Sequence, residues 1–242
     1  MALVIALGAG CAGDDGAAST TVAPEPTTTM APTSTTTEPP LVGQALVVAE
    51  QGLSTFPDPI DATASLGGYG VVLQNPDPDL VATGVRVVTR ILDAAGTELL
   101  VDSAVLNAVM PGQRMAVGRT LIEPITGPTQ LDVRVEVGAW LRPAATTGSL
   151  TATDVATVPE EGGGSATTFT LTSTRPEVED AVDVTAIYRA ADGRILGAES
   201  TTIASISPGA SLPGRIPLLT PIPDLAATEL FVGRGVAAQT TG

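Results

Sequence analysis

Five carboxylates in two short stretches are the residues of this sequence that most clearly offer a specific chemistry. Asp77 and Asp79 stand in a Pro-containing stretch, and Glu177, Glu179 and Asp180 stand in a second one. Carboxylate oxygens are the hard ligands that Ca²⁺ prefers. Their spacing matches no EF-hand loop, and acidic residues are common in turns. We interpret the five as candidate calcium ligands, with an ordinary solvated loop as the alternative.

Composition excludes most catalytic arrangements. The chain has no His, so it can form neither a Ser-His-Asp nor a Cys-His arrangement, nor a usual zinc site. The glycines at 67–68 and 162–164 fit neither the dinucleotide-binding pattern nor the phosphate-loop pattern, and we interpret them as flexible connectors. Paired carboxylates for glycoside hydrolysis stay open, but only 2 % of the residues are aromatic, and sugar clefts generally use aromatic platforms.

We therefore expect no enzymatic activity, no catalytic residues and no cofactor apart from the candidate calcium ion. A carbohydrate-active enzyme and a calcium-dependent adhesion module are the distant alternatives.

The chain is strongly acidic. It carries 26 Asp and Glu against 11 basic residues, all of them Arg, and its formal net charge is -15. The first 85 residues contain nine of the acids and no base. Such a charge repels polyanions, so we expect no binding to nucleic acid.

The only cysteine, Cys11, follows an apolar run at residues 2–7 and the small residues at 8–10. This pattern resembles the lipobox of bacterial lipoproteins, in which the signal peptide is cut before a cysteine that carries a diacylglycerol. The resemblance implies a signal peptide at 1–10, truncated at its start because no basic segment precedes the apolar run. It also implies a lipid anchor on Cys11 at the extracytoplasmic face of the bacterial cell membrane. Leu7 lies one place earlier than the pattern has it, and an apolar tail with an unmodified cysteine is the alternative.

Residues 11–40 are rich in Thr and Pro and poor in apolar side chains. Such a segment cannot repay the entropy of folding, so we predict a disordered stalk after the lipidated cysteine. Its proline content favours an extended chain, which at about 3.1 Å per residue reaches roughly 90 Å. The Thr cluster offers acceptors for O-linked sugars.

From residue 41 onward, short apolar stretches alternate with Gly and Pro turns, and no segment of ten or more residues has helical periodicity. The pattern is clear at Val85, Val87, Thr89 and Ile91, which share one face of a predicted strand. We predict an all-β fold with strands near 45–50, 69–74, 85–91, 98–106, 115–121, 131–137, 150–155, 167–172, 181–188, 194–203, 211–216 and 228–232.

An internal repeat divides this part of the chain. Adding 97 to each residue number carries Val85 onto Val182 and Gly96 onto Gly193, and the offset holds over about fifty residues. The repeat predicts two tandem β-sandwich domains, which we place at 41–142 and 149–236.

The strand predicted at 85–91 is followed by Leu92 and Asp93, ahead of a turn closed by Gly96. A hydrophobic residue and Asp before a Gly turn, in this order of strands, is similar to the FxLyD-type domain of bacterial envelope proteins. The resemblance implies immunoglobulin-like sandwiches on a secreted or anchored protein, usually without enzymatic activity.

The second copy departs from that pattern. Arg189 follows Tyr188, and the acid, Asp192, stands directly before Gly193. Either the strand bulges by one residue or the turn differs from that of the first copy.

Two further side-chain roles can be predicted. Trp140 follows the last strand of the first domain, so we expect it to pack in the interior or between the domains. Arg86, Arg90 and Arg134 share the solvent-facing side with Glu136, which predicts cross-strand ion pairs worth roughly a few tenths of a kcal/mol each.

We expect a non-catalytic lipoprotein of the bacterial cell envelope, displaying two β-sandwich domains that bind another envelope or extracellular component. The expected partners are the membrane, through the lipid on Cys11, and an envelope protein or cell-wall polymer. A purely structural spacer is the alternative. A binding module requires an exposed apolar patch or a free sheet edge, whereas a spacer requires charged edges and a stiff junction. The short connector at 143–148 favours a rigid pair.

Overall fold

The structure is a computed structural model of the 242-residue chain, and it describes residues 39–58, 65–122, 124–125, 127–144, 147–161 and 163–234. The predicted signal peptide, the lipidation site Cys11 and the predicted stalk up to residue 38 lie outside these ranges. Within them every regular element is a strand, so the prediction of an all-β fold is confirmed. No helix long and apolar enough to cross a membrane occurs among the described residues.

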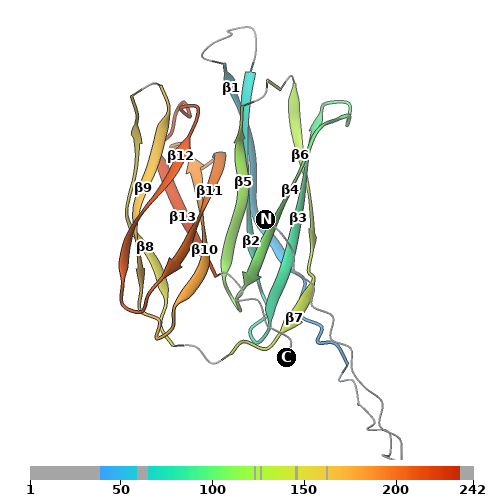
Figure 1. Cartoon of the computed structure of the whole chain (residues 1–242). Helices are drawn as coiled ribbons and strands as arrows, with labels where there is room; N and C mark the ends of the chain where they lie inside the picture. Colours follow the sequence, from blue (N-terminus) through green and yellow to red (C-terminus); the bar gives the residue numbers. More distant parts are fainter. Residues whose placement is uncertain are drawn as a thin grey trace, which may run out of the picture. The chain divides into compact units, whose positions relative to one another are not determined.

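Seven strands form two antiparallel sheets that we call the first body (Figure 1). One sheet has the order β1-β2-β5 and the other the order β4-β3-β6, with the short β7 also paired to β3. Buried aliphatic side chains fill the space between the sheets. The strands are β1 (Val47–Pro57), β2 (Ser65–Gln74), β3 (Val81–Asp93), β4 (Glu98–Val109), β5 (Arg114–Leu121), β6 (Pro128–Glu136) and β7 (Ala139–Leu141).

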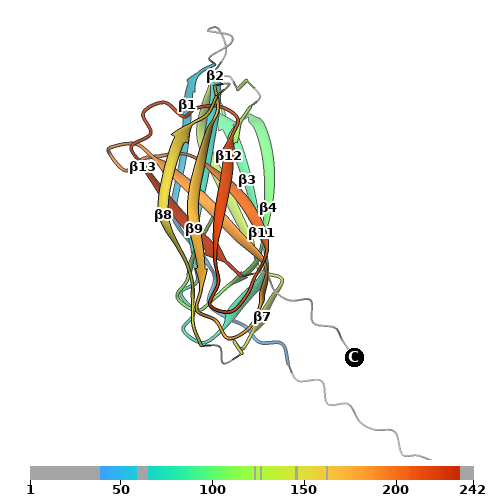
Figure 2. The same cartoon turned by 60° about the vertical axis from the view of Figure 1, so that its left-hand side comes forward.

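Six strands form two further antiparallel sheets, the second body, with the orders β12-β9-β8 and β11-β10-β13 (Figure 2). Their core includes Phe169, Leu171, Val184 and Tyr188. The strands are β8 (Leu150–Pro159), β9 (Ser165–Ser173), β10 (Glu179–Arg189), β11 (Ile195–Ile206), β12 (Ser211–Leu218) and β13 (Ala227–Gly233). Each predicted strand is present, β7 is additional, and the described chain forms two sandwich-like bodies.

Strand β3 follows the predicted alternation. Val85, Val87, Thr89 and Ile91 are each at most 2 % exposed, because their shared face packs into the first core. On the outward face Arg90 pairs across strands with Glu98 at 3.7 Å. Arg134 instead pairs with Glu136 on its own strand at 3.0 Å, so only part of the predicted cross-strand pairing is found.

The strand pairings repeat at the offset seen in the sequence. Val85 lies opposite Leu106 where β3 pairs with β4, and Val182 lies opposite Ile203 where β10 pairs with β11. The same holds on the other side of β3 and β10, where both pairings with β6 and β13 keep their register. The offset therefore relates paired neighbours as well as single residues.

The turns after β3 and β10 are alike in backbone and differ in side chains. The register shifts after Ile91 and after Tyr188, so both strands bulge at the same place. The Gly96 N–H donates to Asp93 O at 3.0 Å, and the Gly193 N–H donates to Ala190 O at 2.9 Å. The second copy therefore departs neither by an extra bulge nor by another turn, but by having Ala where the first has Asp.

The side chain of Asp93 shows what the second copy lacks. Its Oδ1 accepts the N–H groups of Ala95 and Thr97, each at 2.8 Å. In the second body Asp192 takes over part of this role and accepts the Arg194 N–H at 3.0 Å. An acid one position before the glycine thus replaces an acid three positions before it.

The interpretation of Gly67 and Gly68 as a flexible connector is wrong. Both lie inside β2, paired to β1 and β5. A Cβ on Gly68 would lie 2.4 Å from Leu196 O, and a Cβ on Gly70 would lie 2.8 Å from Ile187 Cδ1. Gly68 and Gly70 are required because the second body covers this face of β2 so closely that a side chain would collide with it.

Trp140 packs within the first body. It lies on β7, opposite Ala82 of β3, and it is partly buried against the first core. A Cβ on Gly43 would lie 2.4 Å from the Trp140 ring, so the chain ahead of β1 crosses close to the indole. The predicted packing role is confirmed.

Candidate functional site

The first acidic stretch forms a structural turn between β2 and β3. Asp77 Oδ2 accepts the Gln44 N–H at 3.0 Å, while Oδ1 accepts the N–H groups of Asp79 and Leu80 at 2.9 Å each. These bonds, the one from Gln44 foremost, hold the pKa of Asp77 below its ordinary value of 3.8. Asp79 is exposed. Both carboxylate oxygens of the buried Asp77 thus accept hydrogen bonds from backbone N–H groups.

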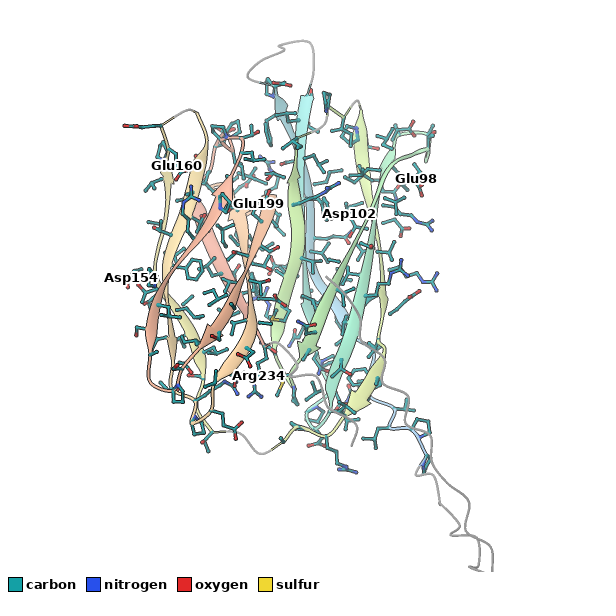
Figure 3. The ribbon with its side chains drawn as sticks, viewed as in Figure 1. Glu98, Asp102, Asp154, Glu160, Glu199 and Arg234 are labelled. Atoms are coloured by element: carbon teal, nitrogen blue, oxygen red, sulfur yellow. The ribbon has the colours of Figure 1, made fainter. Side chains whose placement is uncertain are left out.

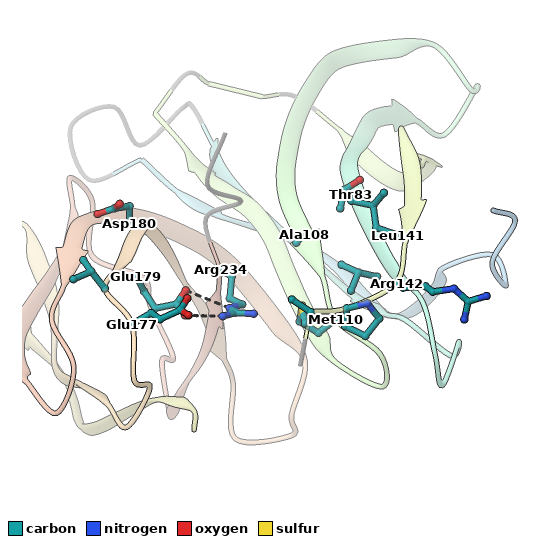
Figure 4. Close-up of a pocket in the computed structure, with 13 residues that line it drawn as sticks. Thr83, Ala108, Met110, Leu141, Arg142, Glu177, Glu179, Asp180 and Arg234 are labelled. Carbon is teal, nitrogen blue, oxygen red and sulfur yellow. Dashed lines mark hydrogen bonds and ion pairs between the residues drawn. The ribbon is translucent and has the colours of Figure 1, made fainter. Parts of the chain in front are cut away.

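The second acidic stretch lies before and at the start of β10, in the second body (Figure 4). Glu179 is buried and binds Arg234 at 2.6 Å and Arg175 at 3.3 Å. Glu177 and Asp180 are exposed. Two guanidinium groups therefore bind Glu179, the buried carboxylate of this stretch.

The structure does not bring the five candidate calcium ligands together. Asp77 and Asp79 belong to the first body, and Glu177, Glu179 and Asp180 to the second. Across the described ranges, no group of three or more Asp, Glu, His or Cys has the arrangement of a metal site.

The second acidic stretch lines a cavity of about 270 Å³ (Figure 4). The first body contributes Thr83, Met110 and Leu141 to its wall, and the chain after β7 contributes Arg142. The wall combines an apolar part with a charged part that is paired internally through Glu179 and Arg234. It offers space beside an ion pair.

A ring of four charges joins the two bodies, and sequence reasoning missed it. Arg189 of β10 binds Glu50 of β1 at 2.8 Å and Glu229 of β13 at 2.6 Å. Arg114 of β5 binds Glu50 and lies 3.9 Å from Glu229. Each carboxylate thus meets one arginine from each body, and the charges balance. We call Glu50, Arg114, Arg189 and Glu229 the charge ring.

The electrostatics of the ring agree with this geometry. Burial alone would raise the pKa of Glu50, but the hydrogen bond and charge of Arg189 and the charge of Arg114 bring it below its ordinary value of 4.5. Burial alone would lower the pKa of Arg189, and its bonds to Glu229 and Glu50 outweigh that effect. Both groups are therefore held in their charged forms by partners on either side.

Glu199 of β11 is a carboxylate of the opposite kind. It accepts the Thr120 N–H at 3.1 Å and also the Thr120 hydroxyl, which ties β11 to β5 of the first body (Figure 3). Burial raises its pKa above the ordinary value of 4.5, more than Thr120 and the charge of Arg119 lower it. No sequence pattern distinguishes Glu199 from an exposed strand residue.

Asp102 is an inward-pointing charge on the edge strand β4 (Figure 3). The Tyr69 hydroxyl donates to Asp102 Oδ2 at 2.5 Å, and Arg119 Nε lies 3.0 Å from the same oxygen. Burial and the carboxylate raise the pKa of Tyr69, so the phenol stays protonated as a donor. Charges that point inward on edge strands oppose uncontrolled strand pairing.

The outward face of β4 carries an apolar row interrupted by one polar residue. Leu99, Val101 and Val105 are 38 %, 47 % and 62 % exposed and share this face with the exposed Ser103, which lies between the two valines. β4 pairs with β3 and lies at the edge of its sheet. The alternation of this segment predicted a strand, but it did not show which apolar face would stay exposed.

Comparison with known proteins gives no family for this chain. No protein-family model matches it, and no curated protein matches it. What the structure establishes is an all-β protein with several antiparallel sheets in two sandwich-like bodies.

Proposed function

We propose that this chain is a non-catalytic, lipid-anchored protein of the bacterial cell envelope, whose two bodies bind another envelope component as one unit. The finer parts of the proposal are a lipid on Cys11, a Thr/Pro-rich stalk, and tandem immunoglobulin-like domains at 41–142 and 149–236. The FxLyD-type resemblance of Leu92, Asp93 and Gly96 supports the domain type.

The observation that carries the binding proposal is the apolar row on β4. Leu99, Val101 and Val105 stand on an edge strand, where an extended segment of a partner can add to the sheet and cover them. Exposed apolar rows on soluble proteins commonly mark interaction surfaces. The inward Asp102 restricts which strands can pair there.

The non-catalytic part is supported by the bonds that three carboxylates make. Glu179 binds arginines, Asp77 binds backbone N–H groups and Glu50 belongs to the charge ring. Each of the three makes bonds that hold the fold together.

Crosslinking with mass spectrometry in intact envelopes tests the proposal. We expect one recurrent partner protein whose crosslinks map beside β4. A Val101→Glu, Val105→Glu variant should lose these crosslinks and remain folded, because both side chains are largely exposed. The matched control is Val158→Glu on edge strand β8, 44 % exposed in the native chain, which should keep them.

A structural spacer is the second candidate, and the contacts between the two bodies favour it. The charge ring and the glycine contacts of β2 make a stiff junction. Crosslinks confined to the chain itself, unchanged by the β4 substitutions, would support a spacer and contradict the binding proposal.

A further inference from the structure

The two bodies meet across a third apolar cluster, which we call the seam. It consists of Val72, Ala116, Ile187, Ile195, Ala198 and Phe231. Val72 and Ala116 come from the first body and the other four from the second. None of the six is more than 6 % exposed, so the seam is as fully buried as the two cores. Separating the bodies would expose all of it to water.

The backbones approach closely around the seam. A Cβ on Gly52 would lie 2.6 Å from Ile195 Cβ, and a Cβ on Gly68 would lie 2.4 Å from Leu196 O. On β5, a Cβ on Gly118 would lie 2.9 Å from Ala198 Cβ. Three strands of one sheet, β1, β2 and β5, thus have glycine where they contact the second body. Without side chains at these positions, the backbones of the two bodies can pack directly against each other.

Polar contacts surround the seam and cross between the bodies. Gln113 Nε2 donates to Val232 O at 3.0 Å, and the Ser54 hydroxyl donates to Leu196 O. The charge ring adds its bonds between Arg189 and Glu50, and the Arg114 guanidinium lies 5.7 Å from the centre of the Phe231 ring. An apolar centre with a paired polar rim is the anatomy of a stable protein interface.

We propose that the seam is a self-sufficient lock, which holds the two bodies together without the connector between β7 and β8. None of the described residues of the connector, 142–144 and 147–149, belongs to the apolar cluster of the seam. A chain cut in the connector therefore stays paired and keeps the arrangement that presents β4. This property goes beyond the proposed function and does not require a partner at β4.

The test uses the full chain with a protease recognition sequence inserted after Ala144. After complete cleavage, gel filtration and native mass spectrometry at neutral pH should find both fragments in one particle of the uncut mass. Separate elution, or precipitation of either fragment, would overturn the proposal.

A variant identifies the seam as the cause. In the cut chain, Gly68→Val should weaken the association of the fragments by at least about tenfold, because its side chain meets the backbone at Leu196. Arg189→Ala provides an independent test if Gly68→Val does not fold, since it removes the centre of the charge ring without adding volume. Val158→Glu, outside the seam, should leave the association unchanged. Unchanged association in both seam variants would overturn the assignment of the lock to these residues.

Discussion

At the scale of single residues, similar carboxylates are held in different ionisation states by their surroundings. Asp77 accepts three backbone N–H groups, which favour the charged form, whereas Glu199 is partly buried with Thr120 as its hydrogen-bond donor. The pKa of Asp77 is lowered and that of Glu199 is raised. The two groups therefore make opposite contributions to stability as the pH changes.

Glu199→Gln should stabilise the protein at pH 7. A raised pKa in the folded state means that ionising Glu199 costs stability at neutral pH, and the cost disappears as the pH falls below the unfolded value of 4.5. Gln retains an acceptor for Thr120. In thermal unfolding, we expect a higher Tm at pH 7, by about 2–4 °C for each kcal/mol recovered, and no difference at pH 4. The exposed Glu177→Gln serves as control, and a lower Tm for Glu199→Gln at pH 7 would contradict this account.

Asp77→Asn should destabilise the protein at neutral pH. The lowered pKa means that the stabilisation by the carboxylate is present above 3.8 and is lost as the pH falls through the folded value. We expect a Tm below that of the native chain at pH 7, with the gap closing in acid. Asp79→Asn, at an exposed position, is the matched control. Equal effects of the two substitutions would argue against a specific role for Asp77.

At the scale of elements, β2 shows a strand whose two faces serve different partners. Tyr69, Val71 and Leu73 face the first core, while Gly68 and Gly70 face the second body. Glycine is unfavourable in an isolated strand because it has no side chain to pack and loses much backbone freedom. Here the close approach of β11 and β10 compensates for that cost.

Gly68→Ala should lower the free energy of unfolding by about 1–3 kcal/mol. The added methyl group would clash with the backbone carbonyl of Leu196, which can move only if the two bodies shift apart. The adjacent Gly67→Ala is a matched control on the other face of β2, where the nearest atoms to a Cβ lie at 3.2 to 3.3 Å and include the mobile ends of Leu121 and Ile125. Denaturant titration compares them. A cost for Gly67→Ala equal to or above that for Gly68→Ala would contradict the assignment of the covered face.

The strands could be predicted because their signals are local. Alternation at Val85 to Ile91 and the turn glycines Gly96 and Gly193 need no knowledge of the partner strands. The role of Gly67 and Gly68 could not be predicted in this way. Two adjacent glycines look the same in the sequence whether they form a loop or lie in a strand covered by a second sheet. Only the contact of Gly68 with Leu196, seen in the structure, shows that they belong to a covered strand.

The same limit applies to the candidate sites. The acidic loops were recognisable because their carboxylates cluster in the sequence, yet the structure uses Asp77 and Glu179 to satisfy backbone and arginine groups. Glu50 and Arg189 are 139 positions apart and carry no local signal of their pairing. Groups that meet only through the association of two bodies are invisible to a pattern read along the chain.

At the scale of the whole molecule, the described chain is organised as two cores joined by a third apolar cluster. The charge ring is neutral within a chain of net charge -15, so the association does not add to the repulsion among its acids. Because the seam is buried as thoroughly as either core, the stability of each body depends on the presence of the other.

Equilibrium unfolding of the full chain in guanidinium chloride tests this interdependence most directly. Trp140 is the only tryptophan and lies in the first body, so its fluorescence reports that body, while far-UV circular dichroism reports the strands of both. We predict coincident transitions with one midpoint, as a single cooperative unit requires. Two separated transitions, with the fluorescence following only one of them, would contradict the account.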